Sequence, residues 1–176
     1  MNYKVNESEV IFRGKVFDVQ IDNLTYVSGN GGRRETVIHN GGAVVVPVKK
    51  DGKILLVKQF RHPFQKYLFE LPAGKLDKNE DPYICATREL KEETGYSSEL
   101  LTKLGSIYTS PGFCTEELYI YLAEGLVEGE HQREEGELGM EIHEFTIEEL
   151  DEMISSGQIK DAKTICGINY YKNLLK

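Results

Sequence analysis

The sequence contains no tryptophan and only three cysteines, Cys85, Cys114 and Cys166. The cysteines are widely spaced and form no CxxC pair. This pattern indicates reduced thiols in a cytoplasmic protein and gives no support to a zinc site or a disulfide framework. Long apolar runs are also absent, because the longest, near Ala43–Val48, is far too short to cross a bilayer. The polar, acidic first residues do not resemble a signal peptide, so a soluble protein without a membrane partner is expected.

Positive charge is scarce as well. The chain of 176 residues has 21 lysines and arginines against 29 aspartates and glutamates, which gives a net charge of −8. General nucleic-acid binding is therefore not expected, since phosphate backbones require basic surfaces. A phosphorylated small molecule remains a possible substrate if metal ions mediate the contact.

Short runs rich in valine, isoleucine, phenylalanine and tyrosine predict strands over much of the chain. Strands are expected over residues 9–14, 15–27 and 66–74, the last ending at Pro72, and over 105–123 in two parts separated by 110–112. Asp51-Gly52 between two apolar runs predicts a hairpin turn. Capping patterns predict helices over 82–94, 147–157 and from Asp161 onward. This order is typical of an α+β protein, with residues 1–40 as a small β subdomain and 41–176 as the main domain.

The middle helix carries an unusual acidic cluster. Asp81 suits its N-cap, Pro82 its first position and Gly95 the residue after its end. Glu89, Glu92 and Glu93 fall within an arc of roughly 100°, and like charges at this spacing destabilise a bare helix by a few tenths of a kcal/mol per pair. Two interpretations follow from the helix alone. One is a solvated acidic face, and the other is a cage for hard divalent cations.

The spacing around the helix resembles the signature of the Nudix hydrolases, which cleave nucleoside diphosphates linked to another moiety. The matching positions are Gly74, Glu80, Arg88, Glu89, Glu92, Glu93 and Gly95. The one departure is Tyr96, where the signature more often has an aliphatic residue. The resemblance favours the cation cage over the solvated face.

The resemblance implies roles for individual residues. Metal ligands would be Glu89, Glu93, Glu92 and the carbonyl of Ala73. Arg88 would orient a glutamate through an ion pair, Glu80 would have a supporting role, and Gly74 would permit a tight turn. The implied fold is an α/β/α sandwich around a mixed β-sheet. The small N-terminal β subdomain would mediate homodimerisation.

Segments outside the signature look like the ADP-ribose (ADP-sugar) pyrophosphatase subfamily. These are Val57–Arg61, Phe69–Gly74, residues 33–47 and Pro111. By that likeness Arg61 would contact the diphosphate through its guanidinium fork. Arg34, Glu35 and an aromatic such as Phe17 would hold the adenine. Relatives often have a stacking tryptophan near Arg34, so here the stacking residue stays open and Phe17 as plain core is an equal alternative.

Relatives also carry a catalytic glutamate on a mobile loop before a late strand. The corresponding segment is residues 132–145, in which Glu137 is the favoured base and Glu135 the second candidate. Glu134 and Glu141 stay open because the register is one residue longer than in relatives. Gly136 and Gly139 would give the loop mobility for closure over substrate.

The expected reaction is hydrolysis of ADP-ribose to AMP and ribose 5-phosphate. The expected cofactor is Mg²⁺, with Mn²⁺ as an alternative. The nucleophile is water, activated by a loop glutamate or by bridging metals. Three alternatives stay open. The chain could be a Nudix hydrolase for another substrate, such as NADH, another nucleotide sugar or a nucleoside triphosphate. It could be a non-catalytic nucleotide sensor, or a structural protein with an acidic helix.

Overall fold

The computed structural model describes residues 2–130 and 139–176. It divides into two compact units. The first comprises Met1–Gly41 with Tyr108–Glu117, and the second comprises Gly42–Ile107 with Leu118–Lys176. Within the described part of the chain, no helix combines the length and the apolar character needed to cross a membrane.

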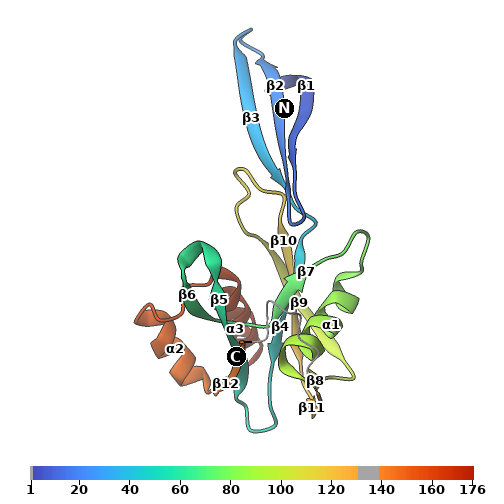
Figure 1. Ribbon diagram of the computed structural model, residues 1–176. Helices are drawn as coiled ribbons and strands as arrows, with labels where there is room; N and C mark the ends of the chain where they lie inside the picture. Colours follow the sequence, from blue (N-terminus) through green and yellow to red (C-terminus); the bar gives the residue numbers. More distant parts are fainter. Residues whose placement is uncertain (1, 131–138) are drawn as a thin grey trace. The chain divides into compact units, whose positions relative to one another are not determined.

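The first unit contains an antiparallel sheet in the order β1-β2-β3 (Figure 1). Its strands are β1 (Tyr3–Arg13), β2 (Asp18–Tyr26) and β3 (Gly31–Ile38). The strand predicted from residue 9 therefore begins at Tyr3. The residues of β1 before residue 9 are mostly polar and show no alternation of apolar side chains. They form a strand because they pair with β2. Side chains support that pairing, as Asn6 Nδ2 donates to Thr25 Oγ1 (2.9 Å) and Ser8 Oγ donates to Asp22 Oδ1 (2.6 Å).

The second unit contains a mixed sheet in the order β7-β4-β10-β9 and an antiparallel sheet in the order β12-β5-β6. Strand β4 is parallel to β10 and antiparallel to β7. The strands of the mixed sheet are β7 (Ala73–Lys75), β4 (Gly42–Pro47), β10 (Glu117–Ala123) and β9 (Leu101–Tyr108). Those of the second sheet are β12 (Glu141–Phe145), β5 (Ile54–Arg61) and β6 (Lys66–Glu70). Two short strands, β8 (Tyr96–Ser97) and β11 (Val127–Glu128), pair separately, and a 3₁₀ turn, His62–Phe64, follows β5.

The three predicted helices are present with their predicted caps. They are α1 (Pro82–Thr94), α2 (Ile147–Ser155) and α3 (Ala162–Leu174). The Asp81 side chain accepts from the backbone N–H of Tyr83, and Gly95 ends α1 with a φ of 75°. Thr146 and Glu149 form the predicted capping box of α2. The predicted hairpin turn lies between β4 and β5, where Gly52 has a φ of 83°.

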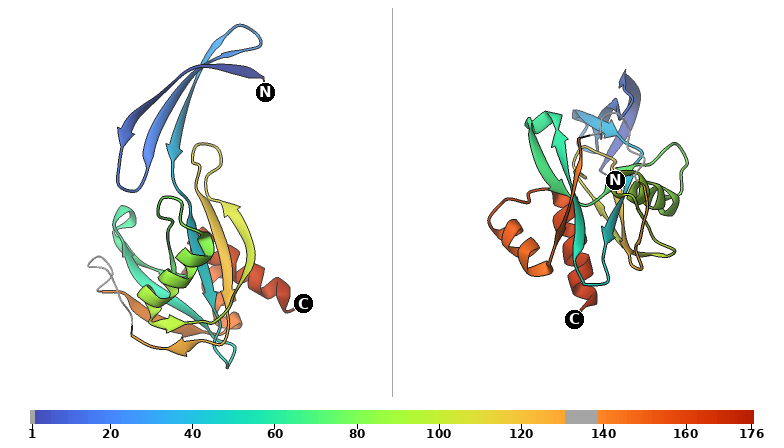
Figure 2. Two further views of the ribbon diagram at one scale, coloured as in Figure 1. Left: turned by 90° about the vertical axis from the view of Figure 1, so that its right-hand side faces the viewer. Right: turned by 60° about the horizontal axis from the view of Figure 1, so that its bottom comes forward.

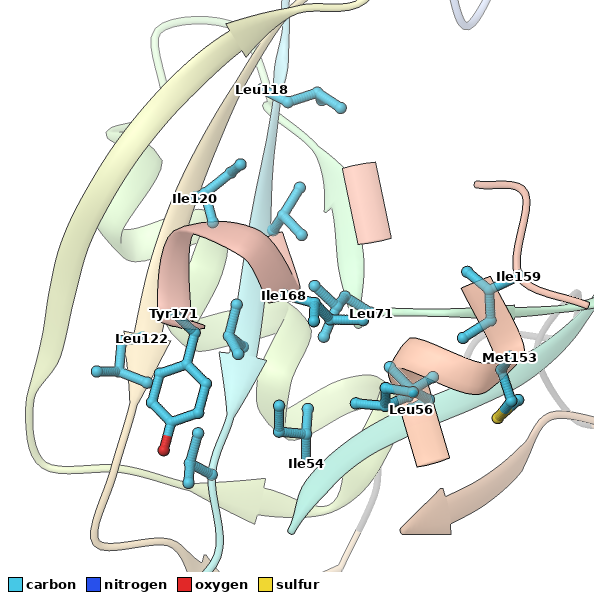
Figure 3. Packing of buried hydrophobic residues seen from close by; sticks show 14 residues of the cluster. Ile54, Leu56, Leu71, Leu118, Ile120, Leu122, Met153, Ile159, Ile168 and Tyr171 are labelled. Carbon is cyan, nitrogen blue, oxygen red and sulfur yellow. The ribbon is translucent and has the colours of Figure 1, made fainter. Parts of the chain in front are cut away.

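Strand β4 explains the layered arrangement, because all of its residues are buried. Successive side chains of a strand point to opposite faces. Val44 and Val46 pack with Ile168 of α3 in one cluster, whereas Ala43 and Val45 pack with α1 residues in another. Helices α1 and α3 thus cover opposite faces of the mixed sheet (Figure 2). This is the predicted α/β/α sandwich, and Figure 3 shows Ile168, Leu71 and Ile120 in its larger core cluster.

The strand predicted within residues 66–74 is present, but it ends at Glu70 and not at Pro72. Strand β6 ends at Glu70, and Ala73 begins β7, which pairs with β4 in the other sheet. The connection is held by polar contacts that a local pattern does not contain. The Leu71 N–H donates to Thr164 Oγ1 (2.8 Å), and the Pro72 carbonyl accepts from the Val45 N–H (2.9 Å). Proline has no N–H to continue a ladder, so the chain changes sheets here.

Candidate active site

A polar cavity of about 410 Å³ lies in the second unit, along α1 and the strands β5 and β7. Its lining residues are Gln59, Arg61, Ala73, Gly74, Lys75, Asp77, Arg88, Glu89, Glu92 and Glu93. Seven of these ten residues are charged. Their chemistry suits an ionic ligand better than an apolar one.

Helix α1 supplies the three glutamates of the cavity. Ala86 and Leu90 bury the apolar side of α1 against the mixed sheet. The same helix also buries Glu89 and Glu93, which are only 7% and 3% exposed. Buried carboxylates are costly unless hydrogen bonds, cations or metal ions compensate them. The acidic cluster is therefore no ordinary solvated face.

Arg88 forms ion pairs with three carboxylates, those of Glu80, Glu89 and Glu92. Its Nη1 group donates to Glu89 Oε1 (2.7 Å) and to Glu92 Oε2 (2.9 Å), and its Nε and Nη2 groups donate to the two oxygens of Glu80 (3.2 Å each). The hydrogen bonds from Arg88 hold the pKa of Glu80 below its usual value. Burial would lower the pKa of Arg88, but its carboxylate partners, Glu80 first, outweigh burial and raise it. The guanidinium thus fixes Glu80, Glu89 and Glu92 in place through its hydrogen bonds.

Gly74 makes room for one of these carboxylates. A Cβ atom at this position would lie 1.7 Å from Glu89 Oε1, far inside van der Waals contact. The backbone of Ala73 holds another, since its N–H donates to Glu93 Oε2 (3.0 Å). Gly74 lies within strand β7 and not in the predicted tight turn. The absence of its side chain and the N–H of Ala73 define where Glu89 and Glu93 lie, and we call this pair of residues the cradle.

Replacing Gly74 with alanine is expected to lower kcat/KM by about 10²-fold, because small displacements of a reacting constellation have effects of this size. The clash falls on the end of the Glu89 side chain and not on backbone atoms, so the melting temperature should change less than the activity. Hydrolysis assays and thermal unfolding would measure both effects. Gly31→Ala is the matched control, as its Cβ would meet nothing within 4 Å. Equal losses in both variants would contradict the cradle.

The donor set fits a divalent metal ion. Within residues 2–130 and 139–176, no group of three histidine, cysteine or acidic side chains is placed to hold a metal ion by itself. Magnesium does not require one, because it usually binds one or two carboxylates and keeps water or substrate phosphate oxygens as its other ligands. The cavity is lined by the carboxylates of the α1 glutamates together with Ala73 and Gly74. Glu89, Glu93, Glu92 and the Ala73 carbonyl are the groups that could hold the ion.

Cysteine chemistry is not indicated at this site. Cys85 is fully buried beneath Gly74 and Lys75, and burial raises the pKa of its thiol to about 12. A thiol with this pKa stays protonated at neutral pH and is a poor nucleophile.

Arg61 lines the cavity as well, but it is not a free cation. Its Nε and Nη2 groups donate to Glu70 Oε1 (2.7 Å) and Oε2 (2.6 Å). Glu70 is the last residue of β6 and is 2% exposed. It received no role from the sequence, although it lies within the Phe69–Gly74 segment. The sequence did offer one indication of a role, because Glu70 is a charged residue between the apolar residues Phe69 and Leu71.

The proposed adenine-binding residues all belong to the first unit. The rings of Phe17 and Phe12 lie 6.0 Å apart. Arg34 stacks on the ring of Tyr26, 5.7 Å from its centroid, and its Nη2 group donates to the Tyr26 hydroxyl (2.7 Å). Glu35 forms an exposed ion pair with Arg33, and Pro111 lies in the turn between β9 and β10. The roles of Phe17, Arg34, Glu35 and Pro111 stay predictions.

The favoured catalytic bases, Glu137 and Glu135, lie outside the described residues, as does Glu134. Glu141 is described and is the first residue of β12. Its carboxylate accepts from Lys58 Nζ (3.2 Å) and pairs with His143 Nε2 (2.9 Å). It is not among the residues that line the cavity.

The fold and this carboxylate-lined cavity define a class of protein. The model of the NUDIX domain family matches residues 39–166, and the chain belongs to this family, as predicted. ADP-ribose pyrophosphatase of Bacillus subtilis (strain 168) is 43% identical over 169 residues, which cover 95% of this chain and 91% of that protein. The methanol dehydrogenase activator of Bacillus methanolicus is 39% identical with the same coverage. A crystal structure of an ADP compounds hydrolase has the same fold, with a TM-score of 0.88 at 20% identity over 99% of this chain and 95% of that one.

Proposed function

We propose that this chain is a divalent-metal-dependent hydrolase that cleaves the diphosphate of ADP-ribose. Water adds to one phosphorus atom and the bridging P–O bond breaks, so that the products are AMP and ribose 5-phosphate. The relative from B. subtilis, which is aligned over nearly the whole of both chains, carries the name of this activity. Mg²⁺ is the proposed cofactor, Mn²⁺ is the alternative, and the reduced cysteines favour the cytoplasm as the site of action.

One observation carries the proposal. A single cavity combines the buried carboxylates Glu89 and Glu93 with the guanidinium of Arg61. The carboxylates provide hard oxygen ligands for a cation, and the guanidinium provides N–H donors for phosphate oxygens. A nucleoside diphosphate bound with a divalent cation needs both kinds of group.

The residues of the chain have separate tasks in this reaction. A bound divalent ion would polarise phosphoryl oxygens and lower the pKa of a coordinated water. Glu89, Glu93, Glu92 and the Ala73 carbonyl would hold the ion, while Arg88 orients Glu89 and Glu92 through hydrogen bonds. Arg61 would bind the diphosphate. Glu137, or Glu135, would accept the proton of the attacking water.

A substrate panel tests the proposal. Purified protein is incubated with ADP-ribose, ADP-glucose, NADH, GDP-mannose or dNTPs, in the presence of Mg²⁺, Mn²⁺ or chelator, and the products are separated by chromatography. AMP and ribose 5-phosphate should form from ADP-ribose only when metal is present. A wide margin for another compound would replace the proposed substrate. No turnover of any compound with either metal would favour a nucleotide sensor. The assay contains no second enzyme. It therefore measures hydrolysis only and does not test an activator function like the one in the name of the B. methanolicus relative.

The first unit is proposed to mediate a homodimer. Several large apolar side chains of this unit are exposed, among them Ile11 (53%), Phe12 (51%) and Val16 (59%). Such side chains are common at interfaces between subunits. Light scattering after gel filtration would give the mass of the assembly. A monomer at micromolar concentration would contradict the proposal.

A further inference from the structure

A cluster of charged residues centred on the buried Glu70 joins β5, β6 and α3 at the edge of the cavity. Glu70 is 2% exposed and binds Arg61 through two hydrogen bonds. Lys163, at the start of α3, also donates to Glu70 Oε2 and pairs with Asp161 Oδ2 (3.0 Å). The side chain of Lys163 is only 12% exposed. Arg61 lines the cavity, whereas Glu70 and Lys163 do not.

The cluster is rigidly framed. Glu70 lies opposite Val57 in the β5–β6 pair, and Arg61 lies opposite Lys66, so the Arg61 side chain leans back along the hairpin to reach Glu70. On the other side, the first turn of α3 holds the chain next to Glu70. Thr164 Oγ1 accepts from the Leu71 N–H (2.8 Å) and donates to the N-cap residue Asp161 (2.6 Å). Helix α3 therefore fixes Glu70, and Glu70 fixes Arg61.

Stability alone is a poor explanation for this cluster. A buried ion pair contributes little net stability compared with well-packed apolar residues, because both charges lose their hydration. Burial would raise the pKa of Glu70, but the hydrogen bonds from Arg61 and the charge of Lys163 outweigh burial and lower it. The carboxylate is thus ionised at neutral pH. An ionised carboxylate that binds an arginine side-on sets the plane of the guanidinium.

The hydrogen bonds to Glu70 use Nε and Nη2 of Arg61, so the opposite edge of the guanidinium, which carries Nη1, is not bonded to Glu70. We propose that Glu70, anchored by Lys163, is a positioning residue that holds Arg61 with this edge toward the diphosphate of the substrate. The inference rests on the proposed function, because it takes the bound anion to be a nucleoside diphosphate.

An effect of the Glu70 charge alone and a positioning role of Glu70 predict opposite changes in KM when Glu70 is replaced. Glu70→Gln removes a negative charge from the neighbourhood of an anionic substrate. If Glu70 acted only through its charge, its removal would strengthen substrate binding and lower KM. If Glu70 positions Arg61, its loss frees the guanidinium and raises KM. We expect KM to rise about tenfold, as for the loss of one oriented charged hydrogen bond, with a much smaller change in kcat.

A double-mutant cycle tests whether Glu70 acts through Arg61. Steady-state kinetics are measured for wild type, Glu70→Gln, Arg61→Met and the double variant, with thermal unfolding of each. In the Arg61→Met background, Glu70→Gln should cause no further change in KM. Glu144→Gln is the matched control, as it removes an ion pair with Lys49 (2.5 Å) elsewhere in the same unit. An unchanged or lowered KM in folded Glu70→Gln, or fully additive effects in the cycle, would overturn the inference.

Arg61→Lys provides a second route if Glu70→Gln does not fold. Arg61 is 38% exposed, and lysine keeps its charge but cannot form the planar fork with Glu70. We expect a rise in KM close to that of Arg61→Met, and a wild-type KM would overturn the inference.

Calorimetric binding of inorganic pyrophosphate with Mg²⁺ separates this inference from the proposed substrate, since it needs neither turnover nor adenosine. Weaker pyrophosphate binding in Arg61→Lys and Glu70→Gln supports the positioning role even if ADP-ribose is not the substrate. Equal dissociation constants in wild type and both variants would overturn it. Failure of the proposed function alone would appear as wild-type protein that binds pyrophosphate but leaves ADP-ribose intact.

Discussion

Replacing Glu93 with glutamine is expected to lower kcat/KM about 10³-fold, the size of effect seen when a preorganised charged group is removed from an active site. Glutamine keeps the shape of the side chain, and its amide oxygen can still accept from the Ala73 N–H. It loses the negative charge that would hold a divalent cation.

Two measurements separate metal binding from folding in this variant. The concentration of Mg²⁺ that gives half-maximal activity should rise, and the melting temperature should stay close to that of the wild type. Glu152→Gln on α2 is the matched control, as Glu152 is exposed and lies away from the cavity. Full activity in Glu93→Gln at low Mg²⁺ would remove Glu93 from the set of metal ligands.

Replacing Arg88 with methionine is expected to lower both activity and stability. Arg88 binds Glu80, Glu89 and Glu92, and its removal leaves these carboxylates to repel one another. We expect a loss of about 2 kcal/mol in the free energy of unfolding, after allowance for the partial exposure of these groups. Activity should fall by about 10- to 100-fold, as for the loss of other residues that orient metal ligands. Denaturant titration and steady-state kinetics would measure the two effects.

The stability loss in Arg88→Met should depend on pH. Arg88 lowers the pKa of Glu80 in the folded protein below its ordinary value of 4.5. The stability that this shift contributes is present above pH 4.5 and is lost as the pH falls through the lowered pKa. The difference between wild type and variant should therefore narrow in acid. Lys91→Met on the same helix is the control, and an equal stability loss at all pH values would contradict the Glu80–Arg88 linkage.

Local patterns were sufficient for the helices and for the cavity face of α1. Asp81, Pro82 and Gly95 mark the ends of α1 because caps and left-handed residues act within one turn of the helix. The spacing of Glu89, Glu92 and Glu93 on one arc follows from helix geometry alone. The family could be predicted for the same reason, because its signature lies on a single loop and helix.

Contacts between distant segments could not be read from local patterns. The strand predicted to end at Pro72 ends at Glu70, where Thr164 from α3 binds the backbone of Leu71. Arg61, expected to contact the diphosphate, is bound to Glu70, which in turn is anchored by Lys163. These residues are separated by 9 and 93 positions in the chain, and only the folded structure brings them together.

One continuous segment of the sequence thus determines which charged groups the site contains and how they are spaced, because capping, helical spacing and charge act over a few residues. The burial of these charged groups, the space around them and their distant partners depend on the tertiary structure. Burial of Glu89 and Glu93 depends on the packing of α1 against the mixed sheet, and the room for Glu89 depends on the approach of the Gly74 backbone. The support of Arg61 depends on α3. Burial and long-range ion pairs are properties of packed layers, and they exist only once those layers have assembled.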